Sequence, residues 1–256
     1  MKIGVIGIGT VGYPLFKALD YYHKEVVCYD PHKESNEWKD IIDCNTIFIC
    51  VPTDSGKDGR LKMDVVDSVL DRLEGDFKGL AVIKSTLGLG YIDNAIDNYL
   101  FDIAVFPEWL REKMSFQDTL KPDLTVIGTE NHKFVDIILE ACPWHKYEGE
   151  ENKLFVVKPE EAVMIKLTAN ALASTKISFT NQILLICEEY DLDVHKVMKA
   201  IRNDPRCAPR YLDPTMGAYG GYCLPKDTLE LAESIKDADL LKAVHELNEI
   251  IKEKFK

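Results

Sequence analysis

The sequence lacks the residue patterns that mark most metal-binding and disulfide-bonded proteins. Its seven cysteines are an odd number and form no C-x-x-C pair, and its six histidines form no H-x-x-x-H or H-E-x-x-H pair. These absences argue against a disulfide framework and against a zinc site. We therefore predict no metal site. We expect the cysteines within strand-like or helical runs, such as Cys28, Cys50 and Cys187, to be buried thiols.

Long apolar runs and an excess of positive charge are also missing. No stretch is apolar enough to span a bilayer, and the N-terminal residues do not resemble a signal peptide. The formal net charge is -12, which argues against nucleic acid or an anionic membrane surface as the main partner. We expect a cytoplasmic protein that binds neither nucleic acid nor a membrane.

With 256 residues, 46% of them hydrophobic, the chain can bury the core of one large or two modest domains. Short apolar runs predict strands at 2–7, 25–30, 46–51, 80–85, 102–107, 124–128 and 153–158. Helical patterns separate them at 11–22, 63–74, 91–100 and 131–141. This alternation is typical of α/β proteins, so we predict a Rossmann-like domain with a mostly parallel sheet over residues 1–158.

Residues 159–256 are predicted to form an all-helical domain. A helical pattern begins at Pro159 and reaches residue 190, with proline at its first position and two glutamates in its first turn. This long central helix would measure roughly 45 Å. A helix of that length often supports a dimer interface, so we expect a homodimer through helix 159–190. Helices at 193–202, 225–236 and 238–254 and an irregular loop at 203–222 follow.

The first strand runs directly into GIGTVG, residues 7–12, which fits the pattern G-x-G-x-x-G. In a dinucleotide-binding loop Gly7 would permit the tight turn, Gly9 would let a pyrophosphate approach, and Gly12 would allow close helix packing. Thr10 and Val11 lie at the helix start, whose free N–H groups would face the phosphates. The alternative is a glycine turn that binds nothing.

Asp30 ends the second strand, 21 residues after Gly9. A carboxylate there would accept hydrogen bonds from the adenosine ribose hydroxyls and would repel a 2′-phosphate, so NAD is predicted rather than NADP. Lys33 lies close to Asp30 and is included among the cofactor contacts. Its positive charge leaves NADP open as the alternative cofactor.

Three further strand ends carry polar residues: VPT (51–53), KST (84–86) and FPEWLRE (106–112). Ligands bind at the carboxyl edge of open α/β sheets, so we expect these motifs to border the binding crevice. The candidates are Val51, Pro52, Thr53, Ser85 and Thr86 for the cofactor, and Glu108, Leu110 and Arg111 for the substrate. The alternative for Glu108 is that it simply begins a helix.

Lys166 and Asn170 lie four residues apart on the long helix and therefore share one face, and Ser174 continues the row. Because the neighbouring positions are apolar, the row is a polar stripe on a mostly buried helix. A buried ammonium group requires a partner or a function. From spacing alone, a salt-bridged lysine beside a hydrogen-bonded asparagine explains the stripe as well as a catalytic pair does.

In GGYCLPKD, residues 220–227, a cysteine stands between two glycines and a helix start. We predict Pro225 as the first helical position. The helix N-terminus and Lys226 would both stabilise a thiolate at Cys223, and the thiolate is the reactive form of cysteine. Asp227 lies in the first turn, where the usual role of a carboxylate is to complement the helix dipole.

Together these motifs resemble the UDP-glucose/GDP-mannose dehydrogenase family of nucleotide-sugar dehydrogenases. The residues that carry the resemblance are GIGTVG, VPT, KST, FPEWLRE, the Lys166/Asn170 pair, DPR at 204–206 and GGYCLPKD. They occur in the family's order over nearly the whole chain, and the last motif is the most specific. The resemblance implies NAD as the cofactor and a nucleotide sugar as the substrate.

The resemblance also implies a four-electron oxidation of a sugar primary alcohol to a carboxylate, through a thiohemiacetal and a thioester on Cys223. It assigns Lys166 and Asn170 to the oxyanion, Glu108 to acid/base chemistry, and Thr86 and Asp227 to the attacking water. It further assigns Gly220 and, across a dimer, Arg206 to the substrate, and Lys226 to the cofactor.

The family's C-terminal nucleotide-binding-like domain has no counterpart among these motifs, so we expect a short form of the family. One arrangement is that a partner chain supplies that domain. GAYGG at 217–221 is one residue longer than the family's usual loop, and REK replaces arginine-glutamate-glycine at 111–113. Two alternatives stay open. One is a two-electron dehydrogenase of the 3-hydroxy-acid type, and the other is a non-catalytic NAD-binding partner protein.

Overall fold

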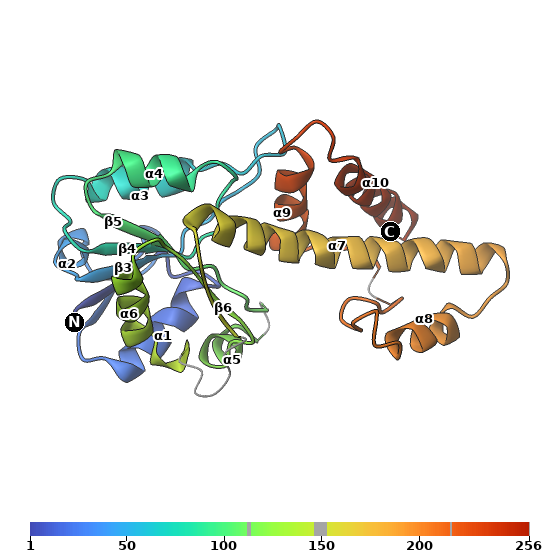
Figure 1. Cartoon of the computed structure of the whole chain (residues 1–256), viewed down its shortest axis with the longest axis horizontal. Coiled ribbons are helices and arrows are strands. Elements are labelled where there is room, and N and C mark those ends of the chain that lie inside the picture. The colour runs from blue at the N-terminus through green and yellow to red at the C-terminus, as the bar shows by residue number, and fades with distance from the viewer. Residues whose placement is uncertain (112–113, 146–152, 216, 256) are drawn as a thin grey trace. The chain divides into compact units, whose positions relative to one another are not determined.

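The structure is a computed structural model that describes residues 1–111, 114–145, 153–215 and 217–255 (Figure 1). The chain divides into two compact units. The first comprises Met1–Thr53 and Lys62–Lys166, and the second comprises Asp54–Leu61 and Leu167–Lys256. The division therefore falls inside the long helix, and a short segment after the third strand belongs with the helical unit.

The described part of the first unit holds a seven-stranded sheet in the order β2-β1-β3-β4-β5-β6-β7. The strands are β1 (Ile3–Ile6), β2 (Val26–Tyr29), β3 (Thr46–Ile49), β4 (Leu80–Ile83), β5 (Asp102–Val105), β6 (Thr125–Gly128) and β7 (Leu154–Val157). Strands β1 to β5 are parallel. β6 pairs with β5 in the antiparallel sense through Val105 and Gly128, and β7 runs parallel to β6. The mostly parallel sheet is thereby confirmed, with one reversal.

Apolar strands form the middle of the sheet, because β1, β3, β4 and β6 are buried along their whole length. Figure 1 shows α3 (Asp64–Leu73) and α4 (Ile92–Asn98) on one face, and α1 (Gly12–Tyr22) and α6 (His132–Ala141) on the other. On the second of these faces, Leu15 of α1 and Ile138 of α6 join one core with Phe48 of β3. This core fixes the start of α1 against the sheet.

In the part of this unit that the structure describes, three short helical segments were not predicted: α2 (Trp38–Ile42), α5 (Ser115–Leu120) and the 3₁₀ turn η2 (Pro143–His145). Each is too short to show the 3.6-residue period in its sequence. α2 instead begins with a capping box, in which Glu37 and Asp40 each accept from the other's backbone N–H group.

The packing of the long helix against β6 depends on Gly128. A Cβ atom at this position would lie 2.7 Å from Cβ of Ala162 and 3.0 Å from Cα of Pro159. Such distances are shorter than real Cβ contacts, so only glycine lets the first turn of α7 (Pro159–Glu189) rest directly on the sheet. The residues of α7 up to Lys166 belong to the first unit.

The second unit contains the rest of α7 together with α8 (Val194–Arg202), α9 (Cys223–Ala232) and α10 (Asp239–Lys254). These confirm the expected helices, with two corrections to α9, which ends at Ala232 and not at residue 236. α9 begins at Cys223, with Tyr222 as its N-cap, and not at Pro225. Proline suits any position of a first turn, because the N–H groups there have no intrahelical acceptor. It therefore marks the turn and not its first residue.

The loop before α9 is held by side chains of two other helices of its own unit. Asn248 of α10 accepts from the Tyr219 N–H at 2.7 Å and donates to the Tyr219 carbonyl at 3.0 Å. Asn181 of α7 donates to the Gly217 carbonyl at 2.8 Å. Since Asn248 is fully buried and Asn181 nearly so, these bonds define the approach of the chain to Cys223.

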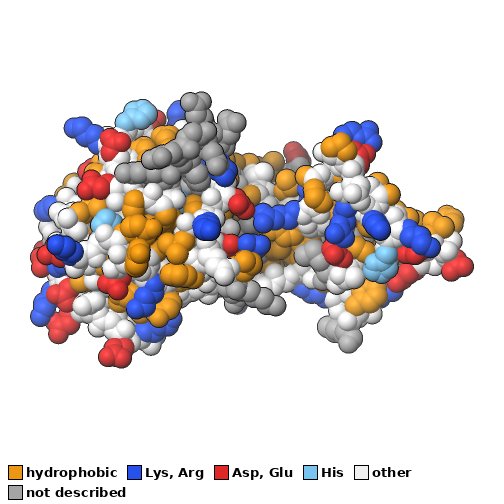
Figure 2. All heavy atoms as spheres, turned by 90° about the horizontal axis from the view of Figure 1, so that it is seen from below, with side chains coloured by type: hydrophobic (Ala, Val, Ile, Leu, Met, Phe, Trp, Pro, Cys, Tyr) orange, Lys and Arg blue, Asp and Glu red, His pale blue; other side chains and the backbone are white. Residues whose placement is uncertain are grey.

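The surface of the molecule carries both signs of charge. On the face shown in Figure 2, Lys and Arg side chains are interspersed with Asp and Glu and with hydrophobic side chains. Among the described residues, no helix combines the length and the apolar composition that a bilayer crossing requires.

Candidate active site

The loop between β1 and α1 forms an open cradle in front of a helix N-terminus. Gly7 has a φ of +83°, and a Cβ there would lie 2.7 Å from the Cys50 carbonyl oxygen. A Cβ at Gly12 would overlap the Gly7 carbonyl, whereas one at Gly9 would meet nothing within 4 Å. Gly7 and Gly12 are therefore required by the loop itself, while the space above Gly9 is available to a ligand. This arrangement fits a pyrophosphate held by backbone N–H groups.

Asp30 and Lys33 both reach this loop. The Asp30 carboxylate accepts from the Ile8 N–H at 3.0 Å and from the His32 N–H at 2.9 Å. Lys33 Nζ donates to the Ile8 carbonyl at 2.6 Å. The structure thus brings both predicted residues to the glycine loop, and the Asp30 carboxylate has further lone pairs for ribose hydroxyls.

The ends of β3 and β4 are joined by Ser85. Its hydroxyl donates to the Val51 carbonyl at 2.7 Å. This residue, predicted to contact the cofactor, therefore also links the two strand ends. Thr53 is buried with 2% of its surface exposed, Thr86 is half-buried and Pro52 is exposed. These residues lie at the carboxyl edge of the parallel strands, as does the glycine loop.

Glu108 and Lys166 form a buried ion pair in the first unit. Lys166 Nζ lies 2.7 Å from the Glu108 carbonyl oxygen and 3.1 Å from its Oε1 atom. Oε2 accepts from the Leu110 N–H at 2.7 Å, and the Lys166 ammonium lies 5.2 Å from the Trp109 ring centre. The side chains of Lys166 and Glu108 are 6% and 10% exposed. Glu108 therefore does not begin a helix; it is the acceptor for the lysine of the polar stripe.

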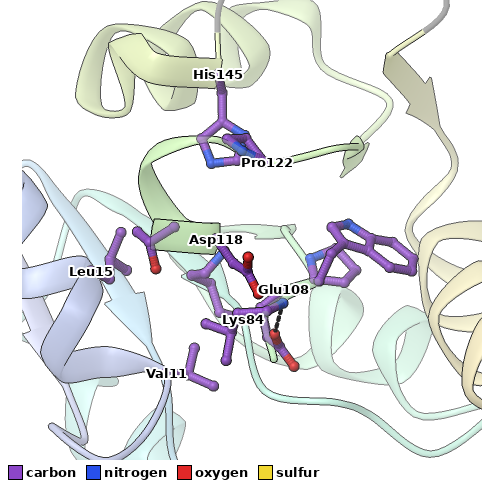
Figure 3. Close-up of a pocket in the computed structure, with 11 residues that line it drawn as sticks. Val11, Leu15, Lys84, Glu108, Asp118, Pro122 and His145 are labelled. Atoms are coloured by element: carbon purple, nitrogen blue, oxygen red, sulfur yellow. Dashed lines mark hydrogen bonds between the residues drawn. The ribbon is translucent and has the colours of Figure 1, made fainter. Parts of the chain in front are cut away.

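Figure 3 shows Glu108 beside Lys84, with Val11 and Leu15 on the side of α1. These four residues and His145 help to line a cavity of about 30 Å³. Sequence reasoning missed Lys84 and His145. Lys84 donates to the Phe106 carbonyl at 3.1 Å, and its burial lowers the pKa of the ammonium group. The lysine was visible in KST, but a sequence does not show that a strand-end lysine turns inward.

Burial disfavours the charged forms of three groups near Lys84. Burial lowers the pKa of His145 to about 3, with Lys84 as the second cause, and raises the pKa values of Cys50 and Cys142 to about 12. His145 shares a hydrogen bond with the Thr125 hydroxyl at 2.6 Å. Cys28, Cys50 and Cys187 are buried thiols, as predicted from their sequence surroundings.

In the second unit, Asn170 and Lys226 converge on Asp227. Asn170 Nδ2 donates to Oδ2 at 2.6 Å, and Lys226 Nζ lies 2.7 Å from Oδ1. Asp227 is 0% exposed. It is therefore not a surface carboxylate that only complements the helix dipole. Cys223 is the first residue of α9 and is exposed. Asp227 follows it by four residues and hence lies on the same helix face.

The remaining predicted substrate residues are exposed. Arg206 Nε lies 2.9 Å and 3.1 Å from the two carboxylate oxygens of Asp204, within its own loop. Arg111 is bound by Asp118 through Nε at 2.9 Å and Nη2 at 2.7 Å. Gly220 is exposed in the loop before Cys223. The structure therefore gathers Glu108 with Lys166, and Asn170 with Lys226 and Asp227, but gives Arg111 and Arg206 acidic partners of their own.

No cluster of three or more His, Cys, Asp or Glu side chains suited to a metal ion occurs among the residues that the structure describes.

Comparison with known families identifies both units. The NAD-binding domain of the UDP-glucose/GDP-mannose dehydrogenase family matches residues 32–141, and the central domain of the same family matches residues 160–250. The open cradle at Gly9 and the position of Asp30 agree with an NAD-binding domain. NAD is therefore the cofactor of this fold.

Individual relatives agree with the family match. The YtcA protein of Bacillus subtilis is 31% identical over 97% of this chain and 68% of its own length. The UDP-glucose 6-dehydrogenase TuaD of the same organism is 32% identical over 97% of this chain and 63% of its own length. A UDP-glucose dehydrogenase structure from Pyrobaculum islandicum superposes with a TM-score of 0.84 at 26% identity, over 97% of this chain and 68% of that chain. The chain thus spans roughly two thirds of each relative, and it belongs to the UDP-glucose/GDP-mannose dehydrogenase family.

Proposed function

We propose that this chain is the catalytic core of an NAD-dependent nucleotide-sugar dehydrogenase that oxidises a sugar primary alcohol to a carboxylate. One observation carries the proposal: Cys223 is exposed in the first turn of α9, one turn before a fully buried Asp227 that binds Asn170 and Lys226. A helix N-terminus favours a thiolate, and a buried, hydrogen-bonded carboxylate one turn away is typical of a site and not of a surface helix.

NAD, when bound, accepts the hydride of each oxidation step. The chain's own groups carry the remaining chemistry. We assign Glu108 to the proton of the substrate hydroxyl in the first oxidation, because its carboxylate is fixed by Lys166 and by the Leu110 N–H. Cys223 Sγ then bonds to the aldehyde carbon to give a thiohemiacetal. The second oxidation converts this to a thioester.

Lys166 and Asn170 are assigned to the oxygen of these intermediates. They lie one turn apart on α7 and both donate hydrogen bonds to carboxylates, so both are oriented before any substrate binds. Water hydrolyses the thioester and releases the acid and the Cys223 thiol. We assign Asp227 and Thr86 to this water.

A UDP-sugar is the first substrate class to test, since the relatives include proteins named UDP-glucose 6-dehydrogenase. Arg206 is assigned to the substrate of the partner protomer in a homodimer through α7. The dimer proposal is supported by an exposed apolar row at seven-residue spacing on α7, Leu172, Phe179 and Ile186, which are 55%, 53% and 44% exposed.

The test is an NADH-release assay with a panel of UDP- and GDP-sugars, combined with calorimetry of NAD and of each sugar nucleotide. Two NADH per sugar and an acid product are expected. One NADH per substrate with no acid would instead support a two-electron dehydrogenase of the 3-hydroxy-acid type. NAD binding without sugar binding or turnover would support a non-catalytic partner protein.

A further inference from the structure

The segment Asp54–Leu61 forms a small hairpin that belongs to the second unit, although it follows β3 in the chain. Ser55 and Leu61 pair in an antiparallel bridge, and the Gly56 N–H donates to the Arg60 carbonyl at 2.6 Å. The Gly59 N–H closes the turn on the Gly56 carbonyl at 3.2 Å. A hairpin this short has no core of its own, so its position depends on what it contacts.

The hairpin contacts the last turns of α9 through Glu230. This glutamate is 0% exposed. Its Oε1 atom accepts from Arg60 Nε at 3.0 Å and pairs with Arg60 Nη2 at 2.9 Å, and its Oε2 atom accepts from the Leu61 N–H at 2.6 Å. Next to this pair, Gly59 has a φ of +80°, and a Cβ there would lie 2.8 Å from Cγ of Glu233. The hairpin backbone therefore rests directly on the helix.

The same hairpin also contacts the first turn of α9. Tyr222, the N-cap residue, donates its hydroxyl to Asp54 Oδ1 at 2.7 Å. The Tyr222 ring lies 5.3 Å from Lys226 Nζ, and Lys226 pairs with Asp227. Asp54 comes directly after Thr53, so the hairpin begins where the VPT motif ends.

The spacing along α9 connects these contacts with the thiol. Glu230 follows Cys223 by seven residues, two helical turns, so both lie on one face, with Asp227 between them. Helix ends fray unless their side chains or flanking residues are fixed. The hairpin holds α9 at two points: at the N-cap residue Tyr222 and, two turns further on, at Glu230.

We propose that the Asp54–Leu61 hairpin is the positioning element for Cys223, with Glu230 and Arg60 as its anchor and the Tyr222 hydroxyl bond to Asp54 as its second point of attachment. Arg60, Tyr222 and Glu230 are positioning residues, not catalytic ones. The inference rests on the proposed role of Cys223 as the nucleophile, but its test does not need turnover. A purely structural hairpin would affect stability and leave the reactivity of the thiol unchanged.

The test is the rate at which iodoacetamide alkylates Cys223 in the full chain, followed by peptide mass spectrometry from pH 6 to pH 10. Tyr222→Phe keeps the ring and removes the hydroxyl bond to Asp54. We expect it to lower the alkylation rate of Cys223 at pH 7 about tenfold, the lower end of the effect of one hydrogen bond to a charged group, and to move the pH profile upward. The rate at Cys207 in the same unit is the internal reference and should not change. Tyr190→Phe, at an exposed tyrosine of that unit, is the matched control.

The anchor is tested with Glu230→Gln combined with Arg60→Met. Glutamine keeps an acceptor for the Leu61 N–H, and the double variant leaves neither charge buried alone. The alkylation rate of Cys223 in the double variant should fall as it does in Tyr222→Phe. In Arg60→Lys, which keeps the positive charge, this rate should fall less. Arg202→Met removes an exposed pair with Asp213 and serves as the control.

An unchanged Cys223 rate and pH profile in folded Tyr222→Phe would overturn the proposal, as would a parallel change at Cys207. If the anchor variant does not fold, Tyr222→Phe decides alone. Where a nucleotide sugar is turned over, kcat should fall in both variants while KM for NAD stays constant. If every sugar is silent, the proposed function fails, but the alkylation rates still decide whether the hairpin positions the thiol.

Discussion

Lys166 donates to two atoms of a single residue, since its Nζ atom lies 2.7 Å from the carbonyl and 3.1 Å from the carboxylate of Glu108. The backbone bond fixes where the ammonium group lies, and the carboxylate bond neutralises it. A lysine held in this way is already oriented to stabilise an oxyanion.

Lys166→Met should destabilise the protein by about 3–5 kcal/mol, because it leaves the Glu108 carboxylate buried without its partner. The double variant Lys166→Met with Glu108→Gln should recover much of this loss, since neither charge then remains. Urea denaturation of both variants measures the difference. Equal losses in the two would show that the pair does not govern stability, and neither variant should oxidise substrate.

Cys223→Ala should abolish acid formation, by more than about a thousandfold, because the thioester cannot form without the thiol. Aldehyde formation and NAD binding should persist, since neither step uses the sulfur. Product analysis beside the NADH count separates the two oxidations. Cys207→Ala removes a half-buried thiol of the same unit and should leave both steps intact.

Gly9→Val should leave the fold intact and weaken NAD binding at least about tenfold. The space above Gly9 is open, so the free energy of unfolding should change by no more than about 0.5 kcal/mol, while the side chain fills the cradle that the pyrophosphate needs. Calorimetry with NAD and urea denaturation test the two halves. A Gly12→Val variant should fail at folding itself, because a Cβ there overlaps the Gly7 carbonyl.

Stability should decrease as the pH falls below about 6.5, partly because of His145. Burial lowers the pKa of this histidine to about 3 from its ordinary value of 6.5, so between these values the unfolded chain binds more protons than the folded one. The contribution of His145 to the free energy of unfolding is therefore fully present above pH 6.5 and is lost progressively toward pH 3. This contribution is on the order of a few kcal/mol in total. His145→Gln should flatten the slope between pH 6 and pH 4, and His195→Gln, at an exposed histidine, should not.

Phe179→Glu should convert the proposed homodimer into monomers, with a Kd at least about a hundredfold higher, because it places an unpaired charge in the apolar row of α7. Sedimentation velocity over a concentration series measures this. Ile235→Glu introduces the same charge at another exposed apolar residue of the second unit and should leave the mass unchanged. A monomeric wild-type protein at micromolar concentration would count against the dimer.

The strands and the cofactor loop could be predicted because their signals are local. Continuous apolar runs define buried strands, and the roles of Gly7 and Gly12 follow from six adjacent residues. The reversal at β6 could not be predicted, because an apolar run does not state the direction of its strand. The start of α9 was misplaced by two residues for a similar reason: Pro225 marks a first turn without fixing its first position.

The site was predictable only where its partners belong to known motifs. Glu108 and Lys166 were chosen separately, and the sequence did not show that they bind each other across 58 positions. Glu230 was missed altogether, since its partners Arg60 and Leu61 lie 170 and 169 residues away. A glutamate at a helix position that faces inward is a usable signal, but only once the helix face is known.

Gly128 leaves no room for even one methyl group beside the turn of α7 that precedes Lys166. Ala162 rests on the bare backbone of this glycine, and Lys166 follows Ala162 by one helical turn. Any side chain at Gly128 would lift that turn away from β6 and would carry the ammonium group away from the carbonyl of Glu108. Efforts to alter the substrate range of this protein should therefore treat the contact between β6 and α7 as fixed and place their changes elsewhere.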